Sequence, residues 1–199
     1  GELLLEPART NYVTNSSFTN WSLSGVSSSI DSNITNPDGT TGAFKVTSTT
    51  IGRQSLSAVT VTSSNGGKAT FSVYLKYGTQ QFVDIYGSYG NWMQAGSGLR
   101  VDLVNGTVSG FDSNTTGTIK AVANDWYYVT ATAVVPSGTV SAQPFYLWFS
   151  EDGATNIPNS TTTGKYLYAF GAQTEIGEFA TSYIPTTGST VTRAADVST

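Results

Sequence analysis

Cysteine and histidine are both absent from this sequence of 199 residues. Without cysteine there is no disulfide, no thiolate nucleophile and no zinc site built on sulfur. Without histidine, the commonest general base and the commonest ligand of transition metals are missing as well. Any chemistry in this chain therefore has to rest on carboxylates, lysines or hydroxyls.

Charge is scarce too. Charged residues make up 11% of the chain, the net charge is −4, and no run of lysine or arginine occurs. Binding to nucleic acid requires a basic footprint that neutralises phosphates, so we expect no nucleic-acid partner. No apolar run approaches the roughly 18 residues that a membrane-spanning helix needs, so we expect no membrane insertion either.

Aromatic residues are plentiful, at 12% of the chain, which favours a packed core over disorder. Stretches rich in Val, Ile, Thr, Tyr and Phe alternate with turn signals such as Pro37-Asp38-Gly39 and Asn105-Gly106. No segment has apolar residues at helical spacing over three turns. The sequence therefore predicts an all-β fold, an antiparallel β-sandwich of the jelly-roll type that fills residues 1–199 as a single domain.

Alternation along three central stretches predicts which side chains face the core, because successive residues of a strand point to opposite faces. The predicted core residues are Phe71, Val73, Leu75, Val83, Ile85, Phe145, Leu147 and Phe149. The same alternation turns Tyr74, Lys76, Asp84, Tyr86, Tyr146 and Trp148 to the opposite side. Three strands thus send amphipathic aromatic residues away from the core.

These outward rings are the best candidates for ligand binding, because a sugar ring can lay its C–H face on an aromatic plate. Lys76, Asp84 and Gln94 are candidate hydrogen-bonding partners for sugar hydroxyls, and Tyr89 and Trp92 lie in the glycine-rich stretch 87–98. The alternative is that loops or a neighbouring chain cover the rings, and that Trp92 plugs an open end of the core.

Carboxylates also have to be considered, since two suitably spaced acids suffice to hydrolyse a glycosidic bond. The candidates are Asp84, Asp102, Asp112, Asp125, Glu151 and Asp152. None of them lies in a recognisable catalytic motif. We therefore predict no catalytic residue and no enzymatic activity.

Several stretches resemble a known family. LLLEPARTNYVTNSSFTNWSLSG, NPDGTTGAFKVT and GAQTEIGEFATSYIPTTGSTVTRAAD, with TFSVYLKYG and NDWYYVTAT between them, resemble a recurrent domain of tail fibres, tail spikes and other virion-surface proteins of tailed phages. That domain is akin to the jelly-roll carbohydrate-binding modules attached to glycoside hydrolases.

The resemblance implies a non-catalytic module at the virion surface or another extracellular location that recognises a glycan or polysaccharide. The alternative is a structural decoration or oligomerisation domain that binds no sugar and contacts copies of itself or neighbouring virion domains. It also implies that the chain is one domain excised from a longer protein.

In modules of this type, an acidic residue that follows an Asn-x-x-Phe motif near the start commonly helps to hold a structural calcium ion. Here Asn15-Ser16-Ser17-Phe18 is followed by Thr19. We therefore predict no cofactor. The alternative is a calcium ion held by Asp31, Asp38 and backbone carbonyl groups.

The last stretch of the chain concentrates charge in an otherwise charge-poor sequence. If the two ends lie side by side in the sandwich, Glu6 and Arg9 come close to Glu175, Arg193 and Asp196. Charges of alternating sign would then fasten the terminal strands in register. Exposed ion pairs contribute only about 0–1 kcal/mol each, so a larger effect requires partial burial.

Overall fold

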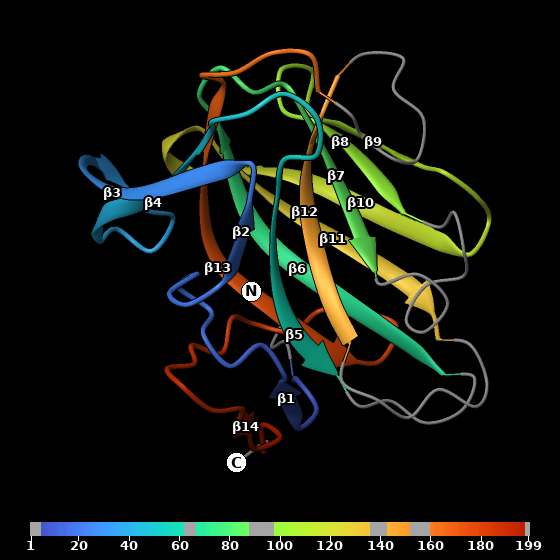
Figure 1. The fold of residues 1–199 in the computed structure, drawn as a ribbon. Coiled ribbons are helices and arrows are strands. Elements are labelled where there is room, and N and C mark those ends of the chain that lie inside the picture. The colour runs from blue at the N-terminus through green and yellow to red at the C-terminus, as the bar shows by residue number, and fades with distance from the viewer. Residues whose placement is uncertain (1–4, 62–66, 88–97, 136–142, 152–159, 198–199) are drawn as a thin grey trace.

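The computed structural model describes residues 5–61, 67–87, 98–135, 143–151 and 160–197. These ranges hold fourteen β-strands and one 3₁₀ turn, Ala123–Asp125. Two six-stranded sheets pack against each other, and a small ribbon joins the two ends of the chain (Figure 1). Within the described ranges no helix has the length and apolar character needed to cross a membrane.

Each sheet has a defined strand order. The first sheet runs in the order β10 (Thr115–Val122), β11 (Trp126–Val134), β6 (Lys68–Tyr77), β13 (Tyr166–Ile176), β4 (Thr41–Ser48) and β3 (Val26–Thr35). The second sheet runs in the order β2 (Ser22–Ser24), β5 (Ser55–Val61), β12 (Gln143–Ser150), β7 (Phe82–Gly87), β8 (Leu99–Asp102) and β9 (Thr107–Gly110). The ribbon consists of β1 (Arg9–Asn11) and β14 (Val191–Arg193).

The path of the chain is that of a jelly roll. Strands β4, β5, β6 and β7 alternate between the first and second sheets, and β11, β12 and β13 alternate again on the return. As a result, β4-β13-β6-β11 faces β5-β12-β7-β8, and all of the paired strands are antiparallel. The predicted antiparallel sandwich of jelly-roll type is confirmed.

The core lies between the sheets, on the faces that the alternation predicts. All eight predicted core residues belong to one buried cluster and are at most 1% exposed. Phe71 from the first sheet stacks on Phe145 from the second, with ring centroids 3.7 Å apart. This contact ties the middle strands of the two sheets together.

A second, smaller cluster covers part of the outer face of the first sheet. It is built from Ala43, Trp126 and Tyr168, and Tyr74 and Phe170 pack against it. Trp126 is fully buried, and its indole N–H donates to the carbonyl of Thr35 at 2.8 Å. This part of the first sheet is therefore closed by side chains and by the end of β3.

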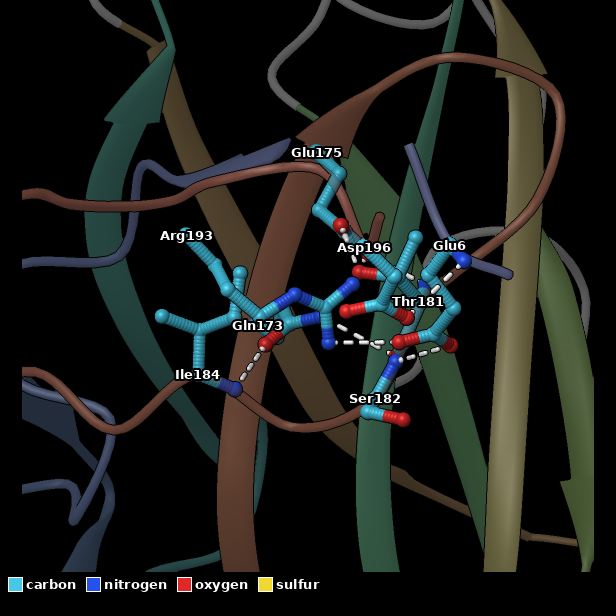
Figure 2. Close-up of polar contacts among 8 residues, drawn as sticks. All are labelled: Glu6, Gln173, Glu175, Thr181, Ser182, Ile184, Arg193 and Asp196. Carbon is cyan, nitrogen blue, oxygen red and sulfur yellow. Dashed lines mark hydrogen bonds and ion pairs between the residues drawn. The ribbon is translucent and has the colours of Figure 1, made fainter. Parts of the chain in front are cut away.

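The two ends of the chain meet as predicted. Arg9 lies opposite Arg193 in the β1–β14 ribbon, and the Arg193 guanidinium forms an ion pair with Glu6 at 2.5 Å. The backbone N–H of Glu6 donates to the Asp196 carboxylate, and the Asp196 N–H donates to the Glu6 carbonyl, both at 3.0 Å (Figure 2). The side chain of Glu6 is only 13% exposed, so this pair is partly buried.

Two of the charged residues that were predicted to meet at the chain ends, Glu175 and Arg9, have other partners. Glu175 is fully buried and accepts hydrogen bonds from the Thr181 hydroxyl at 2.6 Å, the Thr181 N–H at 2.8 Å and the Gln173 amide at 2.8 Å (Figure 2). Arg9 lies over the ring of Phe179 at 5.2 Å and forms no ion pair with a described residue. The polar contacts that join the two ends of the chain therefore involve Glu6, Arg193 and Asp196, while Glu175 fixes the turn that follows β13.

Candidate functional site

Three aromatic side chains form a patch on the outer face of the second sheet. Tyr86 on β7 lies directly opposite Tyr146 on β12, and Trp148 follows two residues later on the same face. The Trp148 ring stacks on Tyr86 with centroids 5.9 Å apart, and it meets Tyr146 edge to face at 5.6 Å. All three residues are half-buried. We call Tyr86, Tyr146 and Trp148 the aromatic patch.

Ring contacts extend the patch in two directions. Phe111 packs on Tyr86 with centroids 6.0 Å apart, and the Arg100 guanidinium lies 5.5 Å from the Phe111 ring. At Trp148 the neighbour is the guanidinium of Arg53, 5.6 Å from the ring centroid. The patch is therefore flanked by two arginines.

Asp84 points away from the core, as the alternation predicts, but it is fully buried. Its two carboxylate oxygens accept hydrogen bonds from Nε and Nη2 of Arg100, both at 2.9 Å, and Nη2 also donates to Ser150 at 2.8 Å. Burial raises the pKa of Asp84, and the hydrogen bonds from Arg100 and Ser150 oppose that rise. A fully buried side chain is not available to a sugar, so Asp84 holds Arg100 in place and does not contact a ligand directly.

Tyr74 and Lys76 were predicted as binding residues together with the rings of the patch, but they do not lie on the same face. They lie on β6 in the first sheet, and their outward face is the opposite side of the sandwich. Tyr74 packs on Tyr128 at 4.7 Å, while Lys76 donates to the Asn124 carbonyl at 2.6 Å and pairs with Asp125 at 3.4 Å. Consecutive strands β6 and β7 belong to different sheets, which is why outward residues on them are separated.

The other three predicted site residues, Tyr89, Trp92 and Gln94, lie outside the described residues. They fall between the end of β7 at Gly87 and the start of β8 at Leu99.

Hydroxyl groups line one side of the aromatic patch. Ser57 on β5 lies opposite Tyr146, and Ser55 lies opposite Trp148. On the next strand, Ser22 and Ser24 lie opposite these two serines and are exposed. We call Ser22, Ser24, Ser55 and Ser57 the serine row. Ser55 is only 7% exposed, so Ser22, Ser24 and the half-buried Ser57 are the members that can bond to sugar hydroxyls beside the rings.

The serines and the two arginines were not among the residues predicted to form the site. Alternation could have oriented Ser55 and Ser57 around the core residue Leu56, and Arg100 between Leu99 and Val101. No pattern in the sequence links Arg53 to Trp148, because Arg53 precedes its strand and the two residues are far apart in the chain.

The described carboxylates that were candidates for catalysis hold local structure. Asp102 accepts hydrogen bonds from the N–H groups of Val104 and Asn105 at 2.9 and 3.0 Å. Burial alone would raise its pKa, but the hydrogen bonds from Asn105, Gln81 and Val104 together lower it. Asp102 therefore shapes the turn between β8 and β9.

Three more of these carboxylates, those of Asp112, Asp125 and Glu151, also bind neighbouring groups of the protein. Asp112 accepts the N–H of Asn114 at 2.9 Å, and Asp125 pairs with Lys76. Glu151 accepts the N–H of Thr161 at 2.8 Å and the Ser160 hydroxyl at 2.9 Å, and the hydrogen bond from Thr161 is the main cause of its lowered pKa. Asp152 lies outside the described residues.

No metal site is evident in the part of the chain that the structure describes, where no three acidic residues cluster. Asp31 accepts hydrogen bonds from the Tyr168 hydroxyl at 3.0 Å and the Asn33 N–H at 3.1 Å. Asp38 accepts from the N–H and hydroxyl of Thr40 at 2.9 and 2.7 Å. Both carboxylates thus accept hydrogen bonds from neighbouring protein groups.

Comparison with known proteins gives structural neighbours only. No model of a protein family matches the chain, and no curated protein matches it. The enzymatically active domain of tailspike protein 4 from bacteriophage CBA120 is 15% identical, with a TM-score of 0.49, over 83% of this chain and 21% of that chain. This chain therefore spans about a fifth of that tailspike structure.

Two further neighbours are xylan-binding domains of Xyn10C from Paenibacillus barcinonensis. The CBM22-2 domain is 12% identical with a TM-score of 0.48, covering 84% of this chain and 98% of that domain. The CBM22-1 domain is 13% identical with a TM-score of 0.43, covering 86% and 94%. A phage tailspike and carbohydrate-binding modules, the two kinds of protein that the sequence stretches resemble, are thus both among the neighbours. At these identities and TM-scores, none of them assigns a ligand or an activity to this chain.

Proposed function

We propose that this chain is a non-catalytic carbohydrate-binding domain of a phage tail or virion-surface protein, and that the aromatic patch is its binding surface. The observation that carries the proposal is the convergence of Tyr86, Tyr146 and Trp148 on two adjacent strands of one outer face. Aromatic rings bring a large apolar area, and the C–H face of a sugar ring can stack on it. The serine row beside them supplies hydrogen-bonding groups for the hydroxyls of the same sugar.

The choice between the two outer faces also favours the second sheet. On the first sheet, Trp126 and Tyr168 belong to a buried cluster, and Glu175 is enclosed by the turn after β13. On the second sheet, the three rings of the patch remain half-buried, and Ser22 and Ser24 are exposed. Tyr74 is half-buried as well, so the exposed serines beside the rings, and not the exposure of the rings themselves, distinguish the patch from Tyr74.

The absence of catalysis in this proposal rests on the described carboxylates. A glycosidase needs one acid free to give a proton and a second free to act as nucleophile or base. Asp84 is bound to Arg100, Asp102 caps a turn, and Glu151 holds residues 160–162. These contacts favour binding without turnover.

A structural role in a virion is the second candidate, and one feature favours it. Ile30 on the edge strand β3 is 65% exposed, and beside it a hollow of about 450 Å³ is lined by residues that include Trp21, Leu23 and Phe44. Exposed apolar groups on an edge strand are suited to contact with another chain. Molecular mass measured by light scattering tests this: an oligomer that Ile30→Asp converts to a monomer would favour the structural role.

The proposed function is tested by a glycan array on the wild type and two variants. Trp148→Ala removes a ring of the patch and should abolish glycan binding. Tyr74→Ala is the matched control, since it removes a half-buried outward ring from the opposite sheet and should leave binding unchanged. Far-UV circular dichroism checks that both variants fold. Glycan binding that survives Trp148→Ala, or that is lost in Tyr74→Ala alone, would contradict the proposal.

A further inference from the structure

We propose that the ligand of the aromatic patch is an acidic glycan, and that the guanidinium of Arg53 binds its carboxylate or sulfate group. This inference rests on the proposed function, and it adds the chemical class of the ligand and the residue that selects it.

Arg53 is an exposed cation at the edge of the patch. Its guanidinium lies 5.6 Å from the centroid of the Trp148 ring, and it forms no ion pair with a described carboxylate. The carboxylate of Glu151, the residue after β12, accepts hydrogen bonds from Ser160 and Thr161 and forms no ion pair with Arg53. A positive charge therefore lies beside the ring on which the sugar would stack.

The backbone on both sides of Arg53 is fixed. Gly52 exchanges two backbone hydrogen bonds with Ser160, at 2.7 and 2.9 Å. Gln54 is 1% exposed, its side chain donates to the Thr162 carbonyl at 2.8 Å, and its own carbonyl accepts the N–H of Phe149. Arg53 thus projects from an anchored segment, so little backbone entropy is lost when its side chain binds a ligand.

Guanidinium chemistry suits this position. A guanidinium over an aromatic ring uses its face for the cation–π contact, while its N–H groups remain able to bind a carboxylate or sulfate through two parallel hydrogen bonds. One sugar could then stack on the patch and direct its anionic substituent at Arg53. A neutral sugar would leave this charge unused.

The second arginine that flanks the aromatic patch, Arg100, has its charge neutralised within the protein. Arg100 is 14% exposed, and both oxygens of the buried Asp84 accept its hydrogen bonds. The protein as a whole carries a net charge of −4, which gives no general attraction for polyanions. A preference for acidic glycans therefore depends on Arg53 itself.

The experiment measures the affinity of the full chain for three acidic oligosaccharides and their neutral counterparts. The probes are oligogalacturonate and hyaluronan fragments with their carboxyl-reduced forms, and chondroitin sulfate fragments with their desulfated, carboxyl-reduced form. The wild type should bind at least one acidic probe about 10-fold or more tightly than its counterpart. A preference shown for oligogalacturonate or hyaluronan, which carry no sulfate, assigns the contact to a carboxylate, whereas a preference confined to chondroitin sulfate, which carries both groups, assigns it to the sulfate.

Variants assign the preference to Arg53. Arg53→Gln should abolish the difference between the acidic probe and its neutral counterpart, and Arg53→Lys should keep part of it. Lys120→Gln is the matched control, because it removes one exposed positive charge from the first sheet and should leave the difference intact.

Two results separate this inference from the proposed function. If both forms of a probe bind equally and Trp148→Ala abolishes binding, the surface is a glycan site but the acidic preference is wrong. An acidic preference that survives Arg53→Gln also overturns the inference. If no probe and no array glycan binds, or if binding survives Trp148→Ala, the proposed function fails and the inference fails with it.

Discussion

At the scale of single residues, the Asp84–Arg100 ion pair shows how costly a buried charge is. Asp84 is fully buried and its pKa is raised, so burial outweighs the help that Arg100 gives to the ionised form. Removing Arg100 leaves a buried carboxylate without its partner, whereas removing both charges leaves no uncompensated ion. Removing Arg100 alone should therefore lower the stability of the protein much more than removing Arg100 and the charge of Asp84 together.

Arg100→Met should lower the free energy of unfolding by about 3–5 kcal/mol at pH 7. Adding Asp84→Asn should restore much of that loss. The pH dependence follows from the sign of the shift: an acid whose pKa is raised by folding binds its proton more tightly in the folded state, so stability increases as the pH falls toward the ordinary value of 3.8. Urea denaturation at pH 7 and pH 4.5 should show a smaller deficit for Arg100→Met at the lower pH. An equal deficit at both pH values, or no recovery in the double variant, would contradict this account.

For Asp84, the sequence was enough to predict to which side of the strand the side chain points, but not that the side chain is buried. Alternation around Val83 and Ile85 placed Asp84 on the outer face correctly. Its burial depends on Arg100 from β8 and on Ser150 from β12, two neighbours that the sequence does not place beside it. The same limit applies to Arg53, whose contact with Trp148 joins residues far apart in the chain.

At the scale of elements, the ribbon of β1 and β14 depends on a partly buried charge pair. Arg193→Glu replaces the Glu6–Arg193 attraction by repulsion in a place where Glu6 is only 13% exposed. Partial burial makes this pair worth more than a surface pair, and we expect a loss of about 1–3 kcal/mol.

The charge-swapped double variant Glu6→Arg/Arg193→Glu should recover part of the loss, because it restores opposite charges at the same two positions. Thermal unfolding of the wild type, both single variants and the double variant gives the coupling energy. Unchanged thermal stability in Arg193→Glu would show that the ends of the chain are held by other contacts.

Strands were easier to predict than the sheets to which they belong. The turn signal Asn105-Gly106 correctly indicates a hairpin, since β8 pairs with β9. In contrast, the consecutive strands β6 and β7 both carry outward aromatic residues but belong to different sheets. Alternation shows to which side of its own strand a residue points, but not to which sheet that strand belongs, and this is why Tyr74 was grouped with Tyr86.

At the scale of the whole molecule, the sandwich is held by apolar contacts between the sheets. Phe71→Ala removes one ring of the Phe71–Phe145 stack and leaves a cavity between the middle strands. The expected loss is about 3–5 kcal/mol in the free energy of unfolding, measured by urea denaturation. Ile51→Ala is the control, since Ile51 is 71% exposed and should change stability by less than about 0.5 kcal/mol. Equal losses in the two variants would contradict this description of the core.

The central claim is that glycan binds to the outer face of the second sheet. The most direct measurement is a titration of the isotope-labelled protein with a glycan that binds, followed through its backbone amide resonances. We predict that the shifted amides cluster on β5, β12, β7 and β8, around Tyr86, Tyr146 and Trp148. Shifts that cluster on β11, β6 and β13, around Tyr74, would contradict the claim.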